Sequence, residues 1–251
     1  MKTIAIYNLK GGVGKTATAV NLAYLASNQG HKTLLWDLDP QASTTFYYQV
    51  KAKVKGGIKK LMGNKSEIED AIKSSHYEKL DILPADLSTR NLDIILDDMK
   101  SSKKRLKNTL HELNGDYDYV FIDSPPGFSI LSENIFAAAD YILLPMIPTT
   151  LSIRAFETVS EYFEDNDLDK KKIIPFFSMV DLRKNMHKDI IDEYQNNPHL
   201  LNSSINYSSE VEKMGIFRAP LPAFAPKSKS SKAYTALWKE FQTRTESKKK
   251  H

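Results

Sequence analysis

A glycine-rich loop close to the amino terminus has the residue types that bind phosphate. It consists of Lys10-Gly11-Gly12-Val13-Gly14-Lys15-Thr16 and lies between an apolar run at 3–7 and an alanine- and leucine-rich run at 16–28. Glycines allow successive backbone N–H groups to turn toward one point, where the start of a helix adds its positive dipole. The loop predicts a nucleotide site in which Lys15 reaches the β- and γ-phosphates and the Thr16 hydroxyl ligates Mg²⁺.

This loop departs from the ordinary phosphate-binding pattern at its first position. The pattern G-x-x-x-x-G-K-[ST] would place a glycine at position 9. The sequence has Leu9 there, and an additional lysine, Lys10, comes directly before Gly11. The departure therefore replaces a glycine and adds a cation close to the expected phosphates.

Carboxylates follow two later apolar runs. The run at 33–36 continues into Asp37-Leu38-Asp39-Pro40-Gln41, and the run at 119–122 ends in Asp123 followed by Ser124-Pro125-Pro126-Gly127. At strand spacing Asp37 and Asp39 point to one side, at the carboxyl end where ligands bind in parallel sheets. The alternative is that these two side chains only cap a strand end or a helix. No Glu stands beside these motifs as a general base, which predicts slow turnover.

The elements that position these groups alternate between strands and helices. The apolar runs predict strands at 3–7, 33–36, 80–83, 119–122, 141–144 and 173–177. Several runs are apolar throughout, as expected for parallel strands covered on both faces. Gly30 is predicted to follow the end of the first helix. The fold class is therefore α/β, a doubly wound, mostly parallel sheet with helices on both faces.

Composition limits the alternatives. The 251 residues suffice for one large domain, expected at 1–245, with 246–251 as a disordered basic tail. The sequence contains no Cys, which excludes disulfides, Cys-ligated zinc and Cys-ligated iron–sulfur clusters. It shows neither a signal-peptide pattern nor an apolar run near the roughly 20 residues that span a bilayer. These features predict a cytoplasmic location, and the net charge of +4 is only mildly basic.

Taken together, these motifs resemble the ParA/MinD ATPases. The loop from Lys10 to Thr16 looks like their deviant Walker A loop, the segment at 37–41 looks like their D-x-D-P-Q motif, and the run ending in Asp123 looks like their Walker B strand with its switch. Segments at 82–85, 144–148, 179–183 and 225–228 are similar to further landmarks in the same order. The chain is most similar to the short Soj-type ParA forms, which lack an N-terminal helix-turn-helix.

The resemblance implies a P-loop ATPase with ATP and Mg²⁺ as cofactors. Lys10 would reach the nucleotide site of the other subunit, and Asp39 would position the attacking water. Lys10, Lys15 and Asp39 are thus the expected catalytic residues, and Thr16, Asp37 and Asp123 the expected metal-site residues. The segment near 178–181 falls where relatives contact adenine, and a guanine-type N-K-x-D motif is absent. The expected nucleotide-binding residues are Lys10, Gly11, Gly12, Val13, Gly14, Lys15, Thr16, Ala17, Ser178, Met179 and Asp181.

The resemblance also implies partners. A homodimer would form with ATP, bind DNA non-specifically on the nucleoid, and release it when a ParB-like or other cargo-adaptor protein stimulates hydrolysis. Phosphate contacts of this kind are salt-sensitive. For each basic residue the alternative is an ordinary solvated surface position. The candidates for DNA contact are Arg183, Lys184, Lys213, Arg218, Lys227, Lys229 and Lys232.

Two other functions have to be weighed. A helix predicted at 230–243 places Tyr234, Leu237, Trp238 and Phe241 on one stripe, which in a MinD-like protein would lie on a membrane. We expect instead that the stripe docks on the core and that the protein does not associate with a membrane. A carboxylate-activating synthetase or amidase of the same fold is the other alternative, but Lys10 and the D-x-D-P-Q segment favour the ParA-type switch.

Overall fold

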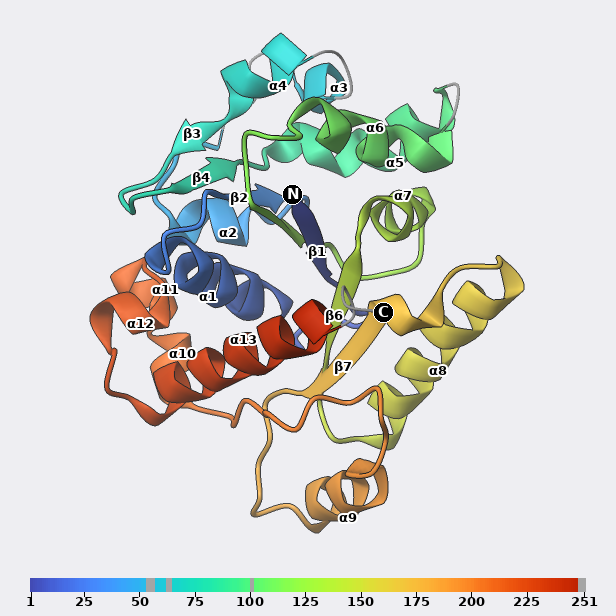
Figure 1. Ribbon diagram of the computed structural model, residues 1–251, viewed down its shortest axis with the longest axis vertical. Coiled ribbons are helices and arrows are strands. Elements are labelled where there is room, and N and C mark those ends of the chain that lie inside the picture. Colours follow the sequence, from blue (N-terminus) through green and yellow to red (C-terminus); the bar gives the residue numbers. More distant parts are fainter. Residues whose placement is uncertain (53–56, 62–64, 100–101, 248–251) are drawn as a thin grey trace.

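A seven-stranded sheet forms the middle layer of the computed structural model, which describes residues 1–52, 57–61, 65–99 and 102–247 (Figure 1). The strand order is β3-β4-β2-β5-β1-β6-β7, and every neighbouring pair is parallel except β3 with β4. The strands are β1 Lys2–Ile6, β2 Thr33–Asp37, β3 Lys73–Ser74, β4 Leu80–Leu83, β5 Tyr119–Asp123, β6 Tyr141–Met146 and β7 Ile173–Phe177.

Helices connect these strands and cover both faces of the sheet. The α-helices are α1 Lys15–Asn28, α2 Ser43–Tyr47, α3 Ile58–Leu61, α4 Lys65–Ala71, α5 Leu92–Asp97, α6 Arg105–Glu112, α7 Ile130–Ala138, α8 Thr150–Asp165, α9 Asn185–Tyr194, α10 Ser209–Glu212, α11 Met214–Phe217, α12 Leu221–Phe224 and α13 Lys229–Ser247. The short 3-10 helices are η1 Leu87–Asn91, η2 Ser102–Lys104 and η3 Lys170–Lys172. The predicted α/β class, with a mostly parallel sheet between helices, is confirmed.

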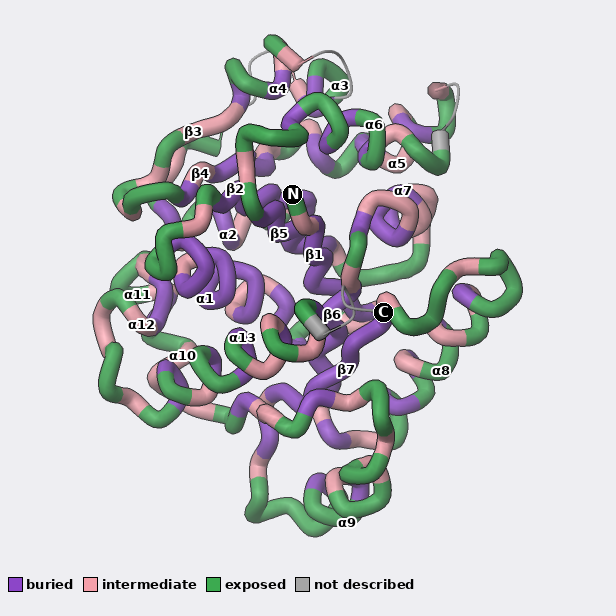
Figure 2. Tube along the Cα trace, viewed as in Figure 1, coloured by how far each residue is buried: buried purple, intermediate pink, exposed green. Residues whose placement is uncertain are grey.

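Two hydrophobic cores lie on opposite faces of the sheet, and the strands contribute to both. On β1, Ile4 and Ile6 pack with α1 and α13, whereas Ala5 packs on the other face with α5, α6 and α7. Alternation along an extended chain explains this division. Figure 2 shows the central strands as buried, which accounts for runs that are apolar throughout rather than alternating.

The order of the central strands decides what meets at the carboxyl edge of the sheet. β5 lies between β1 and β2, and the parallel register aligns Asp123 with Ile6 on one side and with Asp37 on the other. Because the strand order reverses around β1, the connections leave in opposite directions and open a crevice at this edge. The glycine loop after β1 and both carboxylates therefore converge at one place.

The predicted elements agree closely with the observed ones. The strand predictions match β1, β2, β4, β5, β6 and β7 to within two residues at each end, whereas the two-residue antiparallel β3 was not predicted. Gly30 has a φ of +93° and donates its N–H to Ser27 O, as a residue after a helix end does. Helix α13 continues through Ser247, two residues into the predicted tail, and residues 248–251 lie outside the described part.

The stripe on α13 faces the protein interior. Tyr234, Leu237, Trp238 and Phe241 are at most 1% exposed, which confirms that they dock on the core. Within the described part of the chain, no helix combines the length and the apolarity needed to cross a bilayer.

Replacing Trp238 with Ala is expected to lower the free energy of unfolding by about 3–5 kcal/mol, because the large cavity left behind cannot close. The indole Nε1 donates to Gln29 Oε1 at 2.9 Å, and the ring centroid lies 5.3 Å from that of Tyr119. Urea unfolding followed by circular dichroism measures the change. Leu151→Ala, at a position 61% exposed, is the control and is expected to be nearly neutral. A loss below about 1 kcal/mol for Trp238→Ala would contradict the prediction.

Candidate functional site

The glycine loop adopts the backbone conformation that a phosphate cradle needs. Gly12 and Gly14 have φ values of +73° and +89°, in the left-handed region that residues with a Cβ rarely occupy. A Cβ on Gly14 would also lie 2.9 Å from the Ser178 hydroxyl oxygen. Helix α1 begins directly afterwards, at Lys15, so its first N–H groups and its dipole face the loop.

Two residues before the loop hold it against neighbouring strands. Asn8 is 1% exposed; its Oδ1 accepts from the Lys10 N–H at 2.9 Å and its Nδ2 donates to Pro145 O at 2.8 Å. The Tyr7 hydroxyl donates to Gly127 O at 2.9 Å, which ties the loop to the segment after β5. Sequence analysis missed both roles, although a polar Asn directly after an apolar strand was an available signal.

Lys15 is buried at the start of α1. Its side chain is 7% exposed, and its Nζ donates to Lys10 O at 2.7 Å. Burial lowers the pKa of Lys15, while the carboxylates of Asp123 and Asp39 act in the opposite direction and favour its charged form. The ammonium therefore lies in the field of both predicted acidic groups.

The two strand-end carboxylates are completely buried side by side. Thr45 donates to Asp37 Oδ2 from its N–H at 2.9 Å and from its hydroxyl at 2.7 Å. The Thr44 hydroxyl donates to Asp123 Oδ2 at 2.8 Å. Burial raises the pKa of both carboxyls, and the proximity of Asp37 raises that of Asp123 further. Two buried acids at paired strand positions need hydrogen-bond donors or cations around them.

The donor set suits magnesium. Asp123 Oδ1 is buried and has no hydrogen-bond partner among the described residues, and the Thr16 hydroxyl lies close enough to lower the pKa of Asp123. The described part of the chain holds no group of three or more His, Cys, Asp or Glu side chains arranged to hold a metal ion by themselves. Mg²⁺ in nucleotide sites takes one or two protein oxygens and completes its shell with waters and phosphates. Thr16 and Asp123 fit that description.

A cavity of about 630 Å³ opens in front of these groups, a volume typical of sites for ligands the size of a nucleotide. Many residues predicted to bind nucleotide or act on it lie on its wall. They are Gly11, Gly12, Gly14, Lys15, Thr16, Ala17, Asp39, Ser178 and Met179. The described residues that line the cavity do not include Lys10, Val13 or Asp181, which were also predicted to bind nucleotide. Val13 is 1% exposed and therefore buried beneath the loop.

Part of the cavity wall comes from a segment that the sequence motifs did not predict. Ile205, Asn206, Tyr207 and Ser208 line it because Asn206 forms a parallel bridge with Val180, next to Met179. Val211, Glu212, Tyr47 and Tyr234 also lie on the wall. The carboxylate of Asp181 instead binds the guanidinium of Arg183 at 2.8 and 2.9 Å.

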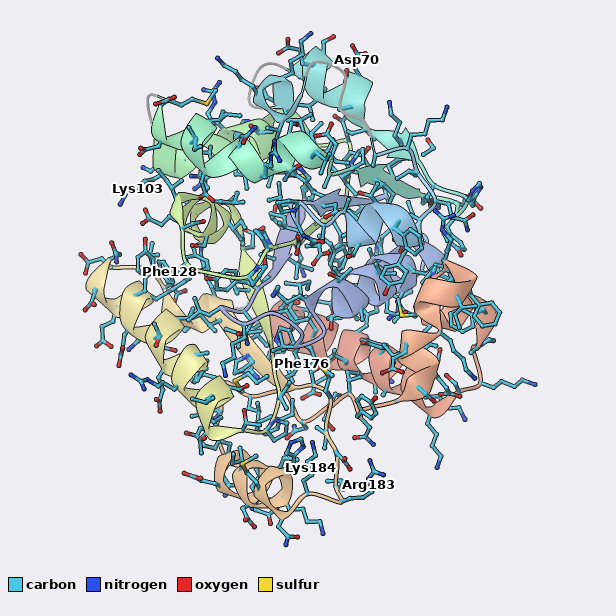
Figure 3. The ribbon with its side chains drawn as sticks, turned by 180° about the vertical axis from the view of Figure 1, so that it is seen from behind. Asp70, Lys103, Phe128, Phe176, Arg183 and Lys184 are labelled. Carbon is cyan, nitrogen blue, oxygen red and sulfur yellow. The ribbon has the colours of Figure 1, made fainter. Side chains whose placement is uncertain are left out.

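The basic residues predicted to contact DNA are all exposed, but they form two groups. Arg183 and Lys184 precede α9, at the end of the molecule seen in Figure 3. Lys213, Arg218, Lys227, Lys229 and Lys232 belong to the segment of α10, α11, α12 and the start of α13, which Figure 1 shows beside α1. The second group adjoins the cavity, because Glu212 on its wall is the neighbour of Lys213.

Comparisons with known proteins agree with this geometry. A family model described as an AAA domain matches residues 1–176. The sporulation initiation inhibitor protein Soj of Bacillus subtilis (strain 168) is 30% identical over 95% of this chain and 97% of its own length.

Solved structures share the fold over almost the whole chain. A variant of McdA from Cyanothece in complex with ATP is 25% identical, with a TM-score of 0.82 and coverage of 96% of both chains. Cobyrinic acid a,c-diamide synthase from Mycobacterium smegmatis with a bound ATP analogue and magnesium is similar in fold, at 24% identity and a TM-score of 0.79 over 95% of this chain and 93% of that one. The matched family model, the full-length similarity to Soj and the phosphate loop lead to one conclusion: this chain belongs to the ParA/Soj family of P-loop partitioning ATPases.

Proposed function

We propose that this ATPase is a dimerising switch, which binds DNA non-specifically in its ATP state and positions DNA or another large cargo. The observation that carries the proposal is the buried Oδ1 of Asp123, which has no hydrogen-bond partner among the described residues. Its neighbours Thr16 and Lys15 both line the cavity. Such an oxygen suits a hydrated magnesium ion. ATP and Mg²⁺ are the cofactors proposed here, in line with the ligands of the McdA variant and of the synthase.

The chain's own residues divide the chemistry between them. The glycine loop and the start of α1 would bind the phosphates through backbone N–H groups, and the Lys15 ammonium would turn from Lys10 O to the β- and γ-phosphates. Asp39, on the cavity wall, would orient the attacking water. Asp37 would support the magnesium shell. Magnesium itself, when bound, neutralises charge on the phosphate oxygens.

Lys10 is proposed to act on the nucleotide of a second copy of the chain. Its backbone N–H donates to Asn8, which fixes it in the loop. Lys10 is not among the described residues that line the cavity of its own chain. Gly11 and Gly12 next to it are exposed, so a second copy has access to the loop. A cation supplied across the interface makes ATP binding and dimerisation depend on each other. Hydrolysis is expected to be slow until a ParB-like or other cargo-adaptor protein accelerates it.

The experiment that tests the proposal is fluorescence anisotropy of a random-sequence DNA duplex, titrated with protein in MgATP or MgADP at two salt concentrations. Tight binding only in MgATP, weakening steeply with salt, is the expected result. Equal or absent binding in both nucleotides would contradict the DNA-carrier function. Sedimentation with liposomes and ATPase assays with small carboxylic acids would then test the membrane and synthetase alternatives.

Lys15→Ala is expected to lower the ATP hydrolysis rate by about 100-fold or more and to abolish ATP-dependent DNA binding, because it removes a cation that neutralises the phosphates. Phosphate release and anisotropy measure the two effects. Lys239→Ala, at an exposed position on α13, is the matched control and should behave as wild type. Cooperative, ATP-dependent DNA binding by Lys15→Ala would count against the proposal.

Asp181→Asn is expected to tighten DNA binding in MgATP. The slope of the logarithm of DNA affinity against the logarithm of salt concentration should steepen by about the amount that one phosphate contact contributes. The physical reason is that Asp181 neutralises Arg183 through two hydrogen bonds, so that a DNA phosphate has to compete with it. Asp189→Asn on α9 removes the same charge without touching this pair, and it controls for the general change in electrostatic potential. An equal effect of both variants would show that Arg183 has no special role.

A further inference from the structure

Helix α2 connects the buried carboxylates to the basic surface. It directly follows the segment Asp39-Pro40-Gln41 and has only five residues. Ala42 before it and Gln49 shortly after it have φ values of +52° and +55°. Residues with a Cβ rarely adopt this conformation, which persists only where surrounding contacts impose it and is frequent in switch regions. The contacts at both ends of α2 therefore matter for what it does.

On its inner side α2 binds both carboxylates through adjacent threonines. The Thr44 hydroxyl donates to Asp123 Oδ2 at 2.8 Å, which leaves Oδ1 as the oxygen for the magnesium shell. The Thr45 hydroxyl donates to Asp37 Oδ2 at 2.7 Å and accepts from the Ala85 N–H at 3.0 Å. Thr44 and Thr45 are 0% and 1% exposed, so neither hydroxyl exchanges freely with water. A movement of either carboxylate would therefore displace the threonine side chains of α2 that are bonded to it.

On its outer side the same helix holds Arg218, one of the residues proposed to contact DNA. The guanidinium carbon lies 4.3 Å from the centroid of the Phe46 ring, a cation–π contact. Gln49 Nε2 donates to Arg218 O at 3.0 Å. Arg218 itself has a φ of +48° at the end of α11. The side chain of Arg218 is thus held by Phe46 of α2, and its main chain by Gln49, two residues after the end of α2.

Residues before and within α2 also form part of the cavity wall. Asp39 before α2 and Tyr47 within it both line the cavity, so a nucleotide there contacts the segment from both ends. Tyr47 and Phe46 are neighbours, with ring centroids 6.0 Å apart. A displacement of α2 that follows the phosphates or the magnesium shell consequently moves the ring on which Arg218 rests.

We propose that α2 transmits magnesium–nucleotide binding to the basic surface, with Thr44 as the positioning residue for Asp123 and Phe46 as the residue that sets the place of Arg218. The inference rests on the proposed function, because it names how that switch reaches its DNA-contact surface. It requires that Phe46 acts on DNA affinity without acting on ATP affinity. A purely structural role of α2 would change stability or ATP binding instead.

The first arm of the test measures the ratio of DNA affinities in MgATP and MgADP by anisotropy. Phe46→Leu keeps an apolar side chain but removes the ring, and it is expected to reduce this ratio roughly two- to five-fold. Its affinity for a fluorescent ATP analogue should stay that of wild type. Phe217→Leu is the matched control, because that exposed ring stacks on Phe224 rather than on Arg218. An unchanged ratio in Phe46→Leu would overturn the inference.

The second arm does not depend on DNA. Since the chain has no Cys, Ile216→Cys at a position 78% exposed accepts a single bimane label two residues from Arg218. MgATP is expected to change the bimane emission, ATP with EDTA to change it much less, and Thr44→Val to abolish the change while Thr44→Ser keeps it. Bimane emission that does not change with MgATP, or equal responses of Thr44→Val and Thr44→Ser, would overturn the inference. A wild-type protein that shows this response but no nucleotide-dependent DNA binding would contradict the proposed function and leave the relay supported.

Discussion

Asp37 and Asp123 are both fully buried at paired positions on neighbouring strands, and this burial constrains the elements around them. The order of β2, β5 and β1 places Asp37 and Asp123 in register at the carboxyl edge, both without solvent exposure. Buried acids are costly unless donors or cations surround them. Thr44 and Thr45 supply hydroxyls, Lys15 supplies a positive charge, and Oδ1 of Asp123 is left without a partner in the described part of the chain. The site is therefore built to gain from a bound cation.

This constraint joins parts that are distant in the sequence. The glycine loop is fixed by Asn8 to β6 and by Tyr7 to the segment after β5, so the cradle and the carboxylates share one frame. Residues 205–208 line the same cavity and directly precede the basic segment that contains α10 and α11. The predicted nucleotide site and the basic surface are consequently joined by short segments, among them α2, which contacts Asp37, Asp123 and Arg218.

Local patterns predicted the strands, the glycine loop and the carboxylates, because each depends on residues close together in the chain. The roles of Asn206 and Tyr207 could not be predicted, since they depend on a bridge between segments far apart in the sequence. Similarity predicts Asp181 near adenine, which stays a prediction, whereas its ion pair with Arg183 could not be predicted from the motif. Thr44, Thr45 and Phe46 form no motif in the sequence. Only the folded chain brings the two threonines to Asp123 and Asp37, at the ends of β5 and β2, and Phe46 to Arg218, at the end of α11.

The proposed switch requires Lys10 of a second copy to complete the nucleotide site, and mixing two inactive variants tests this requirement. Lys10→Ala supplies no lysine to its partner, and Asp39→Asn cannot position the water in its own site. Each protein alone should hydrolyse ATP poorly, whereas mixing them before adding ATP should restore hydrolysis in the sites that combine an intact Asp39 with a partner's Lys10. No gain on mixing, or full activity of Lys10→Ala alone, would contradict a role of Lys10 in the partner's site.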